Sequence, residues 1–182
     1  MNAANPMTDE EIIKSCVSGD SRAQKLLYDK YARRMMGICL RYASDQAGAE
    51  DMMQDGWIKV FKNLHSFGFK GSFEGWLKRI MVNTSLDYLR RNKNYLNQIE
   101  IDVVRDTTLS ASSTSDSLST KELLLIIQQL PTGYRTVFNL FAIEGFTHKE
   151  IAAMLEISES TSKSQYSRAR AQLQKMIQVE YA

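Results

Sequence analysis

Near the C-terminus, residues 146–170 read FTHKEIAAMLEISESTSKSQYSRAR. Thr147 and Glu150 have the spacing of a capping box, in which each side chain accepts a hydrogen bond from the other residue's backbone, and this predicts the start of a short helix. A turn at 156–158 precedes a second helix, expected from Glu159. A short capped helix, a short turn and a second helix together predict a helix-turn-helix.

The second of these helices carries hydroxyl and basic side chains on the face away from its apolar residues. Such groups can reach phosphates and base edges in the major groove of DNA. The residues that we select as DNA contacts are Ser160, Thr161, Lys163, Ser164, Ser167 and Arg168. A solvated helix on the surface of a small bundle would show the same polar face, so the pattern alone leaves both interpretations open.

A segment rich in Ser and Thr precedes this region, with ten such residues among the fourteen of 107–120. A segment of this composition buries too little apolar surface to offset the entropy lost on ordering. We therefore predict a flexible linker at 96–119, between a helical domain at 1–95 and a smaller one at 120–182. Apolar residues follow a helical period on both sides, so the expected fold class is all-α, with two small helical domains.

In the N-terminal domain the clearest helix is expected from about Ala47. Its apolar residues recur at helical spacing over four turns and form one stripe. They are Ala49, Met52, Met53, Gly56, Trp57, Val60, Phe61 and Leu64. A capping box formed by Thr8 and Glu11 predicts an earlier helix, and Ser72 is expected to cap a later one that runs to about Asn94.

Composition excludes several classes of protein. The net charge is +2, from 23 basic and 21 acidic residues, which is too small for a purely electrostatic binder of nucleic acid. No apolar run approaches the roughly 18 residues that span a bilayer, and no secretory signal is visible, so we expect a cytoplasmic protein without membrane insertion. Cys16 and Cys39 lie among apolar residues and are expected to be buried, reduced thiols.

The same residues argue against catalysis. Two Cys and two His give no spacing for a zinc site, and we expect neither a metal nor a cofactor. The chain also has no Gly-rich phosphate loop and no set of residues that would activate a nucleophile, so we do not expect an enzyme.

The C-terminal region resembles region 4 of bacterial sigma factors, in particular the extracytoplasmic-function (ECF) class. The residues that carry the resemblance are those of 130–138, 144–152 and 158–170. The resemblance implies a protein that binds core RNA polymerase and promoter DNA, with the helix-turn-helix on the −35 element. It further implies contacts with the β flap and the β′ coiled coil of the polymerase, and regulation by an anti-sigma factor.

The N-terminal region tests this resemblance independently. A second face of the helix from Ala47 carries Asp51, Gln54 and Asp55, within the segment 49–56, which is similar to the part of sigma region 2 that grips the β′ coiled coil. The resemblance therefore implies that these three residues contact core polymerase. A mixed charged surface without a partner is the alternative interpretation.

The loop before the next helix and the polar side of that helix are implicated in the −10 element. In the ECF class, this loop and an Asn that matches Asn83 hold a flipped base, whose capture offsets an unpairing cost of a few kcal/mol. The residues that the resemblance assigns to −10 contacts are Ser66, Phe67, Phe69, Lys70, Arg79, Asn83, Asp87, Arg90 and Arg91.

A different class of protein has the same C-terminal signature. A regulator with a helix-turn-helix and an N-terminal sensor or dimerisation domain would bind its operator alone, as a dimer and without polymerase. A gel-shift on promoter DNA separates the two, because a sigma factor is expected to bind poorly until core polymerase is added.

Overall fold

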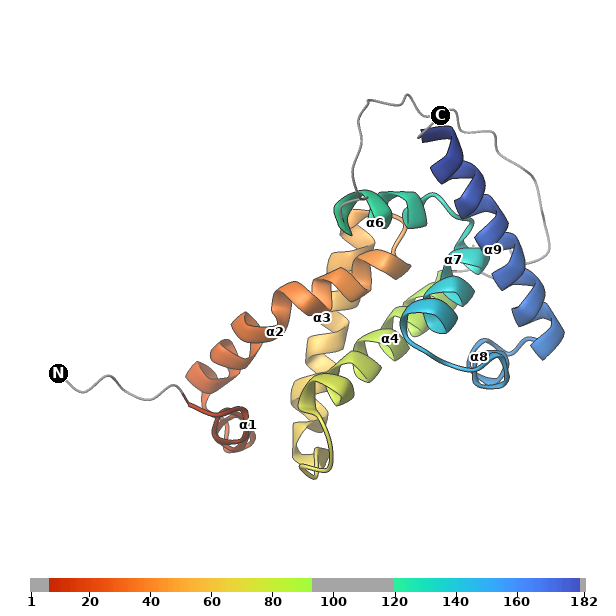
Figure 1. Cartoon of the computed structure of the whole chain (residues 1–182). Helices are drawn as coiled ribbons and strands as arrows, with labels where there is room; N and C mark the ends of the chain where they lie inside the picture. The colour runs from red at the N-terminus through yellow and green to blue at the C-terminus, as the bar shows by residue number, and fades with distance from the viewer. Residues whose placement is uncertain (1–6, 93–119, 181–182) are drawn as a thin grey trace. The chain divides into compact units, whose positions relative to one another are not determined.

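The computed structural model describes residues 7–92 and 120–180, and every regular element in these residues is a helix (Figure 1). The predicted all-α fold class is therefore confirmed. The linker predicted at 96–119 lies outside the described residues.

Contacts among the described residues divide them into two compact units. The first unit takes its residues from Met1–Cys39 and Asp45–Asp87, and the second from Leu40–Ser44 and Tyr88–Ala182. The domain limits given above follow composition rather than contacts, and they stay a prediction.

Five helices follow one another between Thr8 and Asn92. They are α1 (Asp9–Val17), α2 (Ser21–Tyr42), α3 (Gln46–Asn63), the short 3₁₀ helix η1 (Leu64–Ser66) and α4 (Phe73–Arg91). The capping box at the start of α1 is confirmed, since the Thr8 amide donates to the Glu11 carboxylate at 2.7 Å and the Glu11 amide to the Thr8 hydroxyl at 3.3 Å. Helix α3 begins one residue earlier than expected, because the Asp45 side chain caps it through the Gly48 amide at 2.7 Å.

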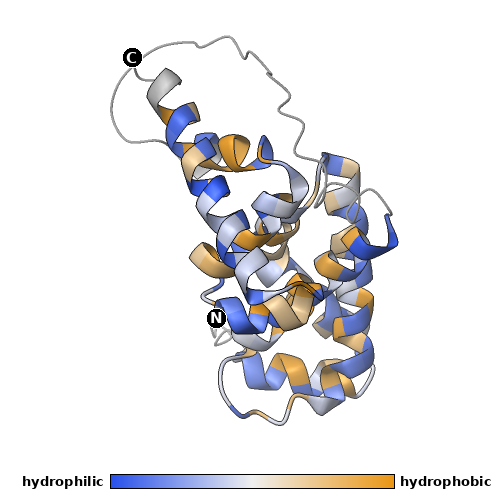
Figure 2. Ribbon diagram, turned by 90° about the vertical axis from the view of Figure 1, so that its right-hand side faces the viewer, coloured by the Kyte–Doolittle hydropathy of each residue, from blue (hydrophilic) through white to orange (hydrophobic). Residues whose placement is uncertain are grey.

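Hydrophobic and hydrophilic residues alternate along the helical ribbons in Figure 2. The interior of the first unit is built from the apolar sides of its helices. Met52 and Val60 of α3 and Leu77 of α4 are completely buried. Helices α3 and α4 approach closely at Gly56, where an added Cβ would lie 2.3 Å from the sulfur of Met81. The apolar stripe predicted for α3 therefore faces the core, and the side chain of Met81 fills the space beside its glycine.

Both cysteines are buried, as expected, and neither forms a disulfide within the described part of the chain. Burial, aided by the negative charge of Asp20, raises the pKa of the Cys16 thiol and keeps it protonated.

The second unit contains the remaining helices. They are α6 (Thr120–Gln128), α7 (Thr132–Phe138), the π-helical turn η2 (Asn139–Ile143), α8 (His148–Leu155) and α9 (Glu159–Glu180). Pro131 stands at the start of α7, where its fixed φ suits a helix N-terminus. The sequence predicts one helix from Pro131 to about Glu144. In the structure, α7 instead passes into the wider π-helical turn η2, and Gly145, at φ +81°, follows the end of that turn. Ser119 and Glu122 also have the spacing of a capping box before α6, but Ser119 lies outside the described residues.

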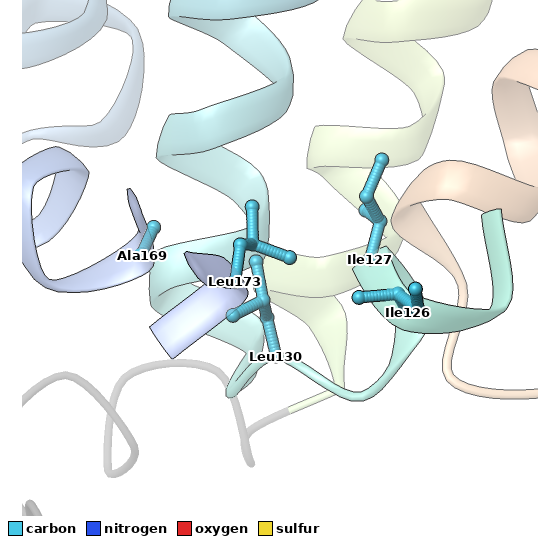
Figure 3. Close-up of a cluster of buried hydrophobic side chains, with 5 residues drawn as sticks. All are labelled: Ile126, Ile127, Leu130, Ala169 and Leu173. Carbon is cyan, nitrogen blue, oxygen red and sulfur yellow. The ribbon is translucent and has the colours of Figure 1, made fainter. Parts of the chain in front are cut away.

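A cluster of buried apolar side chains holds α6 against α9 (Figure 3). The cluster consists of Ile126, Ile127, Leu130, Ala169 and Leu173, with Tyr134, Phe138, Met176 and Ile177 packed against it half-buried. Helix α9 packs in addition on α7 and α8, so its inner face is covered along most of its length.

Candidate functional site

Helices α8 and α9 form the predicted helix-turn-helix. The capping box of α8 is present, with the Thr147 amide donating to the Glu150 carboxylate at 2.8 Å and the Glu150 amide to the Thr147 hydroxyl at 3.3 Å. Glu156 closes α8 in the left-handed conformation, at φ +57°, and turns the chain into α9. The local signals read from the sequence therefore place both helices correctly.

The first turn of α9 is held by hydroxyl groups. The Ser158 oxygen accepts a hydrogen bond from the Thr161 amide at 3.0 Å, and it lies 2.8 Å from the hydroxyls of both Ser160 and Thr161. One turn later, the Ser164 hydroxyl donates to the Thr161 carbonyl at 3.0 Å. These bonds fix the start of the helix, so its side chains leave from a defined backbone.

The outward face of α9 is lined by small side chains. Ser160, Ser164, Ser167 and Ala171 recur at i, i+4, i+7 and i+11, and all are exposed. Of the six residues selected from the sequence, five are exposed, and Thr161 is half-buried. A face of small residues lets a helix backbone approach a groove closely, with hydroxyls available for hydrogen bonds.

The inward face of α9 contains polar groups that the sequence analysis did not place there. Ser162 is completely buried, and its hydroxyl lies 2.9 Å from Nδ1 of His148 in α8. The His148 ring stacks on Phe141, with centroids 4.2 Å apart. Gln165 is also buried, and its side-chain oxygen has no hydrogen-bond partner among the described residues. The spacing of Ser162 and Gln165 relative to Ala169 is the signal that could have placed them inside.

Three basic residues of α9 contact a neighbouring side chain. Lys163 pairs with the carboxylate of Glu159 at 2.7 Å, and its hydrogen bond and charge lower the pKa of that carboxyl. The guanidinium of Arg168 donates to the hydroxyl of Tyr134 at 3.4 Å. The guanidinium of Arg170 lies over the ring of Tyr166, 5.9 Å from its centroid.

On α3, the residues selected as polymerase contacts lie along one side of the helix. Asp51 and Gln54 are exposed and Asp55 is half-buried, with Ile58, 51% exposed, one turn further along the same side. Ile58 thus adds an apolar side chain to a surface that otherwise carries carboxylates and an amide.

On α4, five side chains follow one another along a single side at i, i+3, i+7, i+11 and i+14. They are Trp76, Arg79, Asn83, Asp87 and Arg90. Arg79, Asn83 and Arg90 are exposed, and so is Arg91, which lies just off this line. Asp87 instead pairs with Lys59 of α3 at 2.8 Å, so this carboxylate joins the two helices.

The loop between η1 and α4 contains two phenylalanines that differ in exposure, although the sequence pattern assigns both the same role. Phe67 is 6% exposed and packs on Phe73 and Trp76, with ring centroids 5.2 Å and 5.5 Å away. Phe69 is 45% exposed, at φ +54°, and the ammonium of Lys14 lies 5.7 Å from its ring centroid. Phe69 thus presents an aromatic surface outward, while Phe67 supports the loop from inside.

The other two selected loop residues lie at its edges. The Ser66 hydroxyl donates to the Asn63 carbonyl at 2.7 Å, and Lys70 is exposed. The Ser72 hydroxyl caps α4 by accepting from the Gly75 amide at 3.3 Å, as expected.

Two further observations concern residues 7–92 and 120–180. Within these ranges, no three His, Cys, Asp or Glu side chains gather as a metal site. Over the same part of the chain, no helix combines the length and the apolarity that crossing a membrane requires.

Two family models match the chain. Residues 27–95 match the model described as Sigma-70 region 2, and residues 120–173 match the one described as Sigma-70, region 4. The first match includes α3, the loop and α4, and the second includes the helix-turn-helix.

Whole-length relatives carry related names. The chain is 29% identical to the ECF RNA polymerase sigma-E factor of Haemophilus influenzae, over 96% of this chain and 98% of the relative. It is 26% identical to the RNA polymerase sigma-H factor of Pseudomonas aeruginosa, over 93% of this chain and 94% of the relative. It is also 26% identical to the ECF RNA polymerase sigma-E factor of Escherichia coli K12, over 94% and 95%.

Solved structures show a similar fold. CnrH in complex with the cytosolic domain of CnrY matches with a TM-score of 0.51 and 23% identity, over 94% of this chain and 98% of that one. The sigma factor RpoE in complex with the anti-sigma factor NepR from Bartonella quintana matches with a TM-score of 0.52 and 23% identity, over 86% and 97%.

Proposed function

The chain belongs to the ECF class of the sigma-70 family, and from this premise we propose that α3 binds core RNA polymerase while α4 and α9 read the two promoter elements. As a sigma factor of this class, the protein directs RNA polymerase to promoters and acts by binding rather than by catalysis. The observation that carries the DNA-binding part is the exposed face of hydroxyls and cations on the second helix of the helix-turn-helix.

The polymerase contact is assigned to Asp51, Gln54 and Asp55. Their side of α3 combines carboxylates, an amide and the exposed Ile58, which suits a partner helix that offers basic groups around an apolar centre. The partner of this face is then the β′ coiled coil, and the second unit would meet the β flap.

The −10 element is assigned to the loop and the exposed side of α4. Phe69 offers an aromatic ring on which an unpaired base can stack, and Asn83 offers an amide that can pair with a base edge. Arg79, Arg90 and Arg91 supply positive charge for phosphates. Phe67 and Asp87, because of their burial and ion pair, would act by holding this surface in shape.

The −35 element is assigned to α9, through Ser160, Thr161, Lys163, Ser164, Ser167 and Arg168. Regulation by an anti-sigma factor is a further part of the proposal, supported by the RpoE structure, which is a complex of a sigma factor with such a protein. In this proposal the limits 1–95, 96–119 and 120–182 correspond to region 2, linker and region 4, and the protein works in the cytoplasm.

Transcription in vitro with purified core polymerase, followed by mapping of the start sites, tests the function. We expect initiation at discrete promoters only when the protein and core polymerase are both present. Tight, operator-like binding of promoter DNA by the free protein as a dimer would instead identify a conventional helix-turn-helix regulator.

The polymerase face has its own test. Asp51→Lys and Gln54→Ala are expected to weaken the affinity for core polymerase, because they remove a carboxylate and an amide from the contact. Asp29→Lys on α2 makes the same charge change at another exposed position of the first unit and is the matched control. If Asp51→Lys binds core polymerase with unchanged affinity, this face of α3 does not contact the polymerase.

A further inference from the structure

His148, the first residue of α8, has a side chain that is held from two sides within the second unit. Its Nδ1 lies 2.9 Å from the hydroxyl oxygen of Ser162, which is completely buried in α9. Its ring stacks on Phe141, with the centroids 4.2 Å apart and the two planes 12° from parallel. The stacking fixes the plane of the imidazole, and the contact with Ser162 fixes how the ring is turned within that plane.

Phe141 reaches this position from the π-helical turn η2 (Asn139–Ile143). Single turns of this kind are frequent at functional sites. The ring of Phe141 also packs on Tyr166 of α9, with centroids 4.5 Å apart, so it is held on its own account. Three elements of the second unit, η2, α8 and α9, thus hold the imidazole of His148 together.

The second nitrogen of the ring, Nε2, points away from Ser162, because the two nitrogens lie on different edges of an imidazole. Among the described residues, none forms a hydrogen bond with Nε2, and this atom is not enclosed by protein. Nε2 carries a proton when the Ser162 hydroxyl donates to Nδ1, and also when the ring is doubly protonated. In both states an N–H donor of fixed direction faces outward.

The charges around His148 leave room for an anion. The carboxylate of Glu150 accepts a hydrogen bond within the capping box of α8, and that of Glu159 pairs with Lys163 at 2.7 Å. Lys149, the next residue along the chain, is exposed. The two ammonium groups therefore equal the two carboxylates in number, and no excess of negative charge opposes an anion at Nε2.

The position of His148 in the helix-turn-helix identifies the ligand. In this motif the second helix enters the major groove while the first helix crosses the phosphate backbone. Ser162 stands between Thr161 and Lys163, which are assigned to the −35 element. His148 therefore contacts the turn of α9 that carries them, and it does so from the first helix. A phosphate oxygen only accepts hydrogen bonds, so a fixed N–H donor at this place suits it.

We propose that His148 donates a hydrogen bond from Nε2 to one backbone phosphate of the −35 element, and that Ser162 is a positioning residue for this contact. The proposal rests on the function assigned to α9 above. In this scheme Ser162 and Phe141 do not touch DNA and act only through the imidazole. The contact reads no base, and it sets the place along the duplex at which α9 enters the groove.

A scan of the phosphates in reconstituted holoenzyme tests the proposal. Each phosphate of the −35 element is replaced in turn by a neutral methylphosphonate, and promoter affinity is measured for wild type and His148→Asn at the same salt concentration. Asparagine keeps an amide near the place of Nδ1 but has no group at the place of Nε2. At one phosphate, the replacement is expected to cost wild type about 2- to 12-fold more affinity than it costs His148→Asn, which is the value of one hydrogen bond.

Ser162→Ala separates positioning from binding. It leaves Nε2 in the protein but lets the ring turn, so the loss at the same phosphate is expected to shrink toward that of His148→Asn. Thr136→Val is the matched control, because it removes another completely buried hydroxyl of the second unit, one that donates to the Thr132 carbonyl of its own helix at 2.8 Å. This variant should keep the wild-type phosphate profile.

Equal losses for wild type and His148→Asn at every phosphate of the −35 element would overturn the contact. A wild-type profile in Ser162→Ala, or the same reduced loss in Thr136→Val, would overturn the positioning role of Ser162. If wild-type holoenzyme depends on neither the bases nor the phosphates of a −35 element, the function assigned to α9 fails, and this result is distinct from a failure of His148 alone.

Discussion

The interiors of the two units differ in how many polar side chains they bury. In the first unit the described buried side chains are mostly apolar, with aromatic rings packed around Phe67, and the buried polar ones are Thr84 and Ser85. Among the described residues of the second unit, five polar or charged residues are buried. They are Arg135, Thr136, Asn139, Ser162 and Gln165.

This difference shows that the two units depend on different forces. The loss of buried apolar volume costs free energy through the cavity that it leaves, whereas a buried polar group costs free energy unless it is hydrogen-bonded. Arg135 illustrates the cost, since burial lowers the pKa of its guanidinium to about 10 while a bond to the Gln128 carbonyl, at 2.9 Å, offsets part of the loss. The first unit should therefore respond most to lost volume, and the second to changes in polar groups.

The largest expected effect is that of a cavity in the first unit. Leu77→Ala empties a completely buried site, and we expect the free energy of unfolding to fall by about 3–5 kcal/mol. Trp57 and Trp76 both lie in the first unit, so denaturant unfolding followed by tryptophan fluorescence reports on this unit.

Leu26→Ala is its control, because Leu26 is 50% exposed in the same unit. This change is expected to cost less than about 0.5 kcal/mol. A loss below about 1 kcal/mol in Leu77→Ala would mean that the site collapses and that apolar packing does not dominate this interior.

A smaller effect, of opposite sign, is expected in the second unit. Gln165→Met keeps an unbranched side chain of similar length and removes the buried oxygen that has no partner. We expect the stability of the helix-turn-helix to rise by about 1 kcal/mol, measured by hydrogen exchange of the α8 and α9 amides.

Gln174→Met on the exposed side of α9 is the matched substitution and should leave exchange unchanged. Faster exchange in Gln165→Met would show that the amide contributes to stability, and that the polar interior of this unit is not a cost.

The features that could be predicted from the sequence are those that depend on interactions between residues close in the chain. The capping boxes at Thr8 and Thr147, the turn before Glu159 and the apolar stripe of α3 depend on neighbours within a few residues, and all are present. The widening of the chain at Asn139–Ile143 has no comparable local signal, because i+5 hydrogen bonds carry no recognisable residue pattern.

Contacts between side chains from distant segments could not be predicted from the sequence either. Composition treats Phe67 and Phe69 as equivalent, and their different exposures follow from packing on α4. Asp87 looks like part of a polar DNA-facing side until Lys59 of another helix is seen to pair with it. The inward position of Ser162 was hidden because a serine on a polar helix is expected to face water.

The smallest effect tests a charged contact at the surface of the first unit. Burial would raise the pKa of Asp9, but hydrogen bonds from Lys30 and Tyr31 outweigh it and hold the pKa below the usual value of 3.8. A carboxyl whose folded pKa is lowered stabilises the fold above its unfolded pKa, and this stabilisation is lost as pH falls through the folded value.

Asp9→Asn should therefore remove part of the loss in thermal stability that wild type shows on acidification from about pH 6 to about pH 3, again followed by tryptophan fluorescence. Asp29→Asn removes an exposed carboxylate whose partner, Lys25, lies on the same helix, and it is the control for the loss of one surface charge. If the thermal stability of wild type and Asp9→Asn falls equally on acidification, the contact of Asp9 does not stabilise the first unit.

Helix α9 separates two sets of residues along its length. Those that hold the unit together, such as Ser162, Ala169 and Leu173, point inward, and Ser160, Ser164 and Ser167 on the outward line are all exposed. Substitutions on the outward line leave the interior intact, so under the proposed assignment of α9 to the −35 element, promoter preference would diverge between descendants of one gene without a penalty in folding. A duplicated copy could acquire a new set of target genes by a few changes at these serines, while keeping the same polymerase.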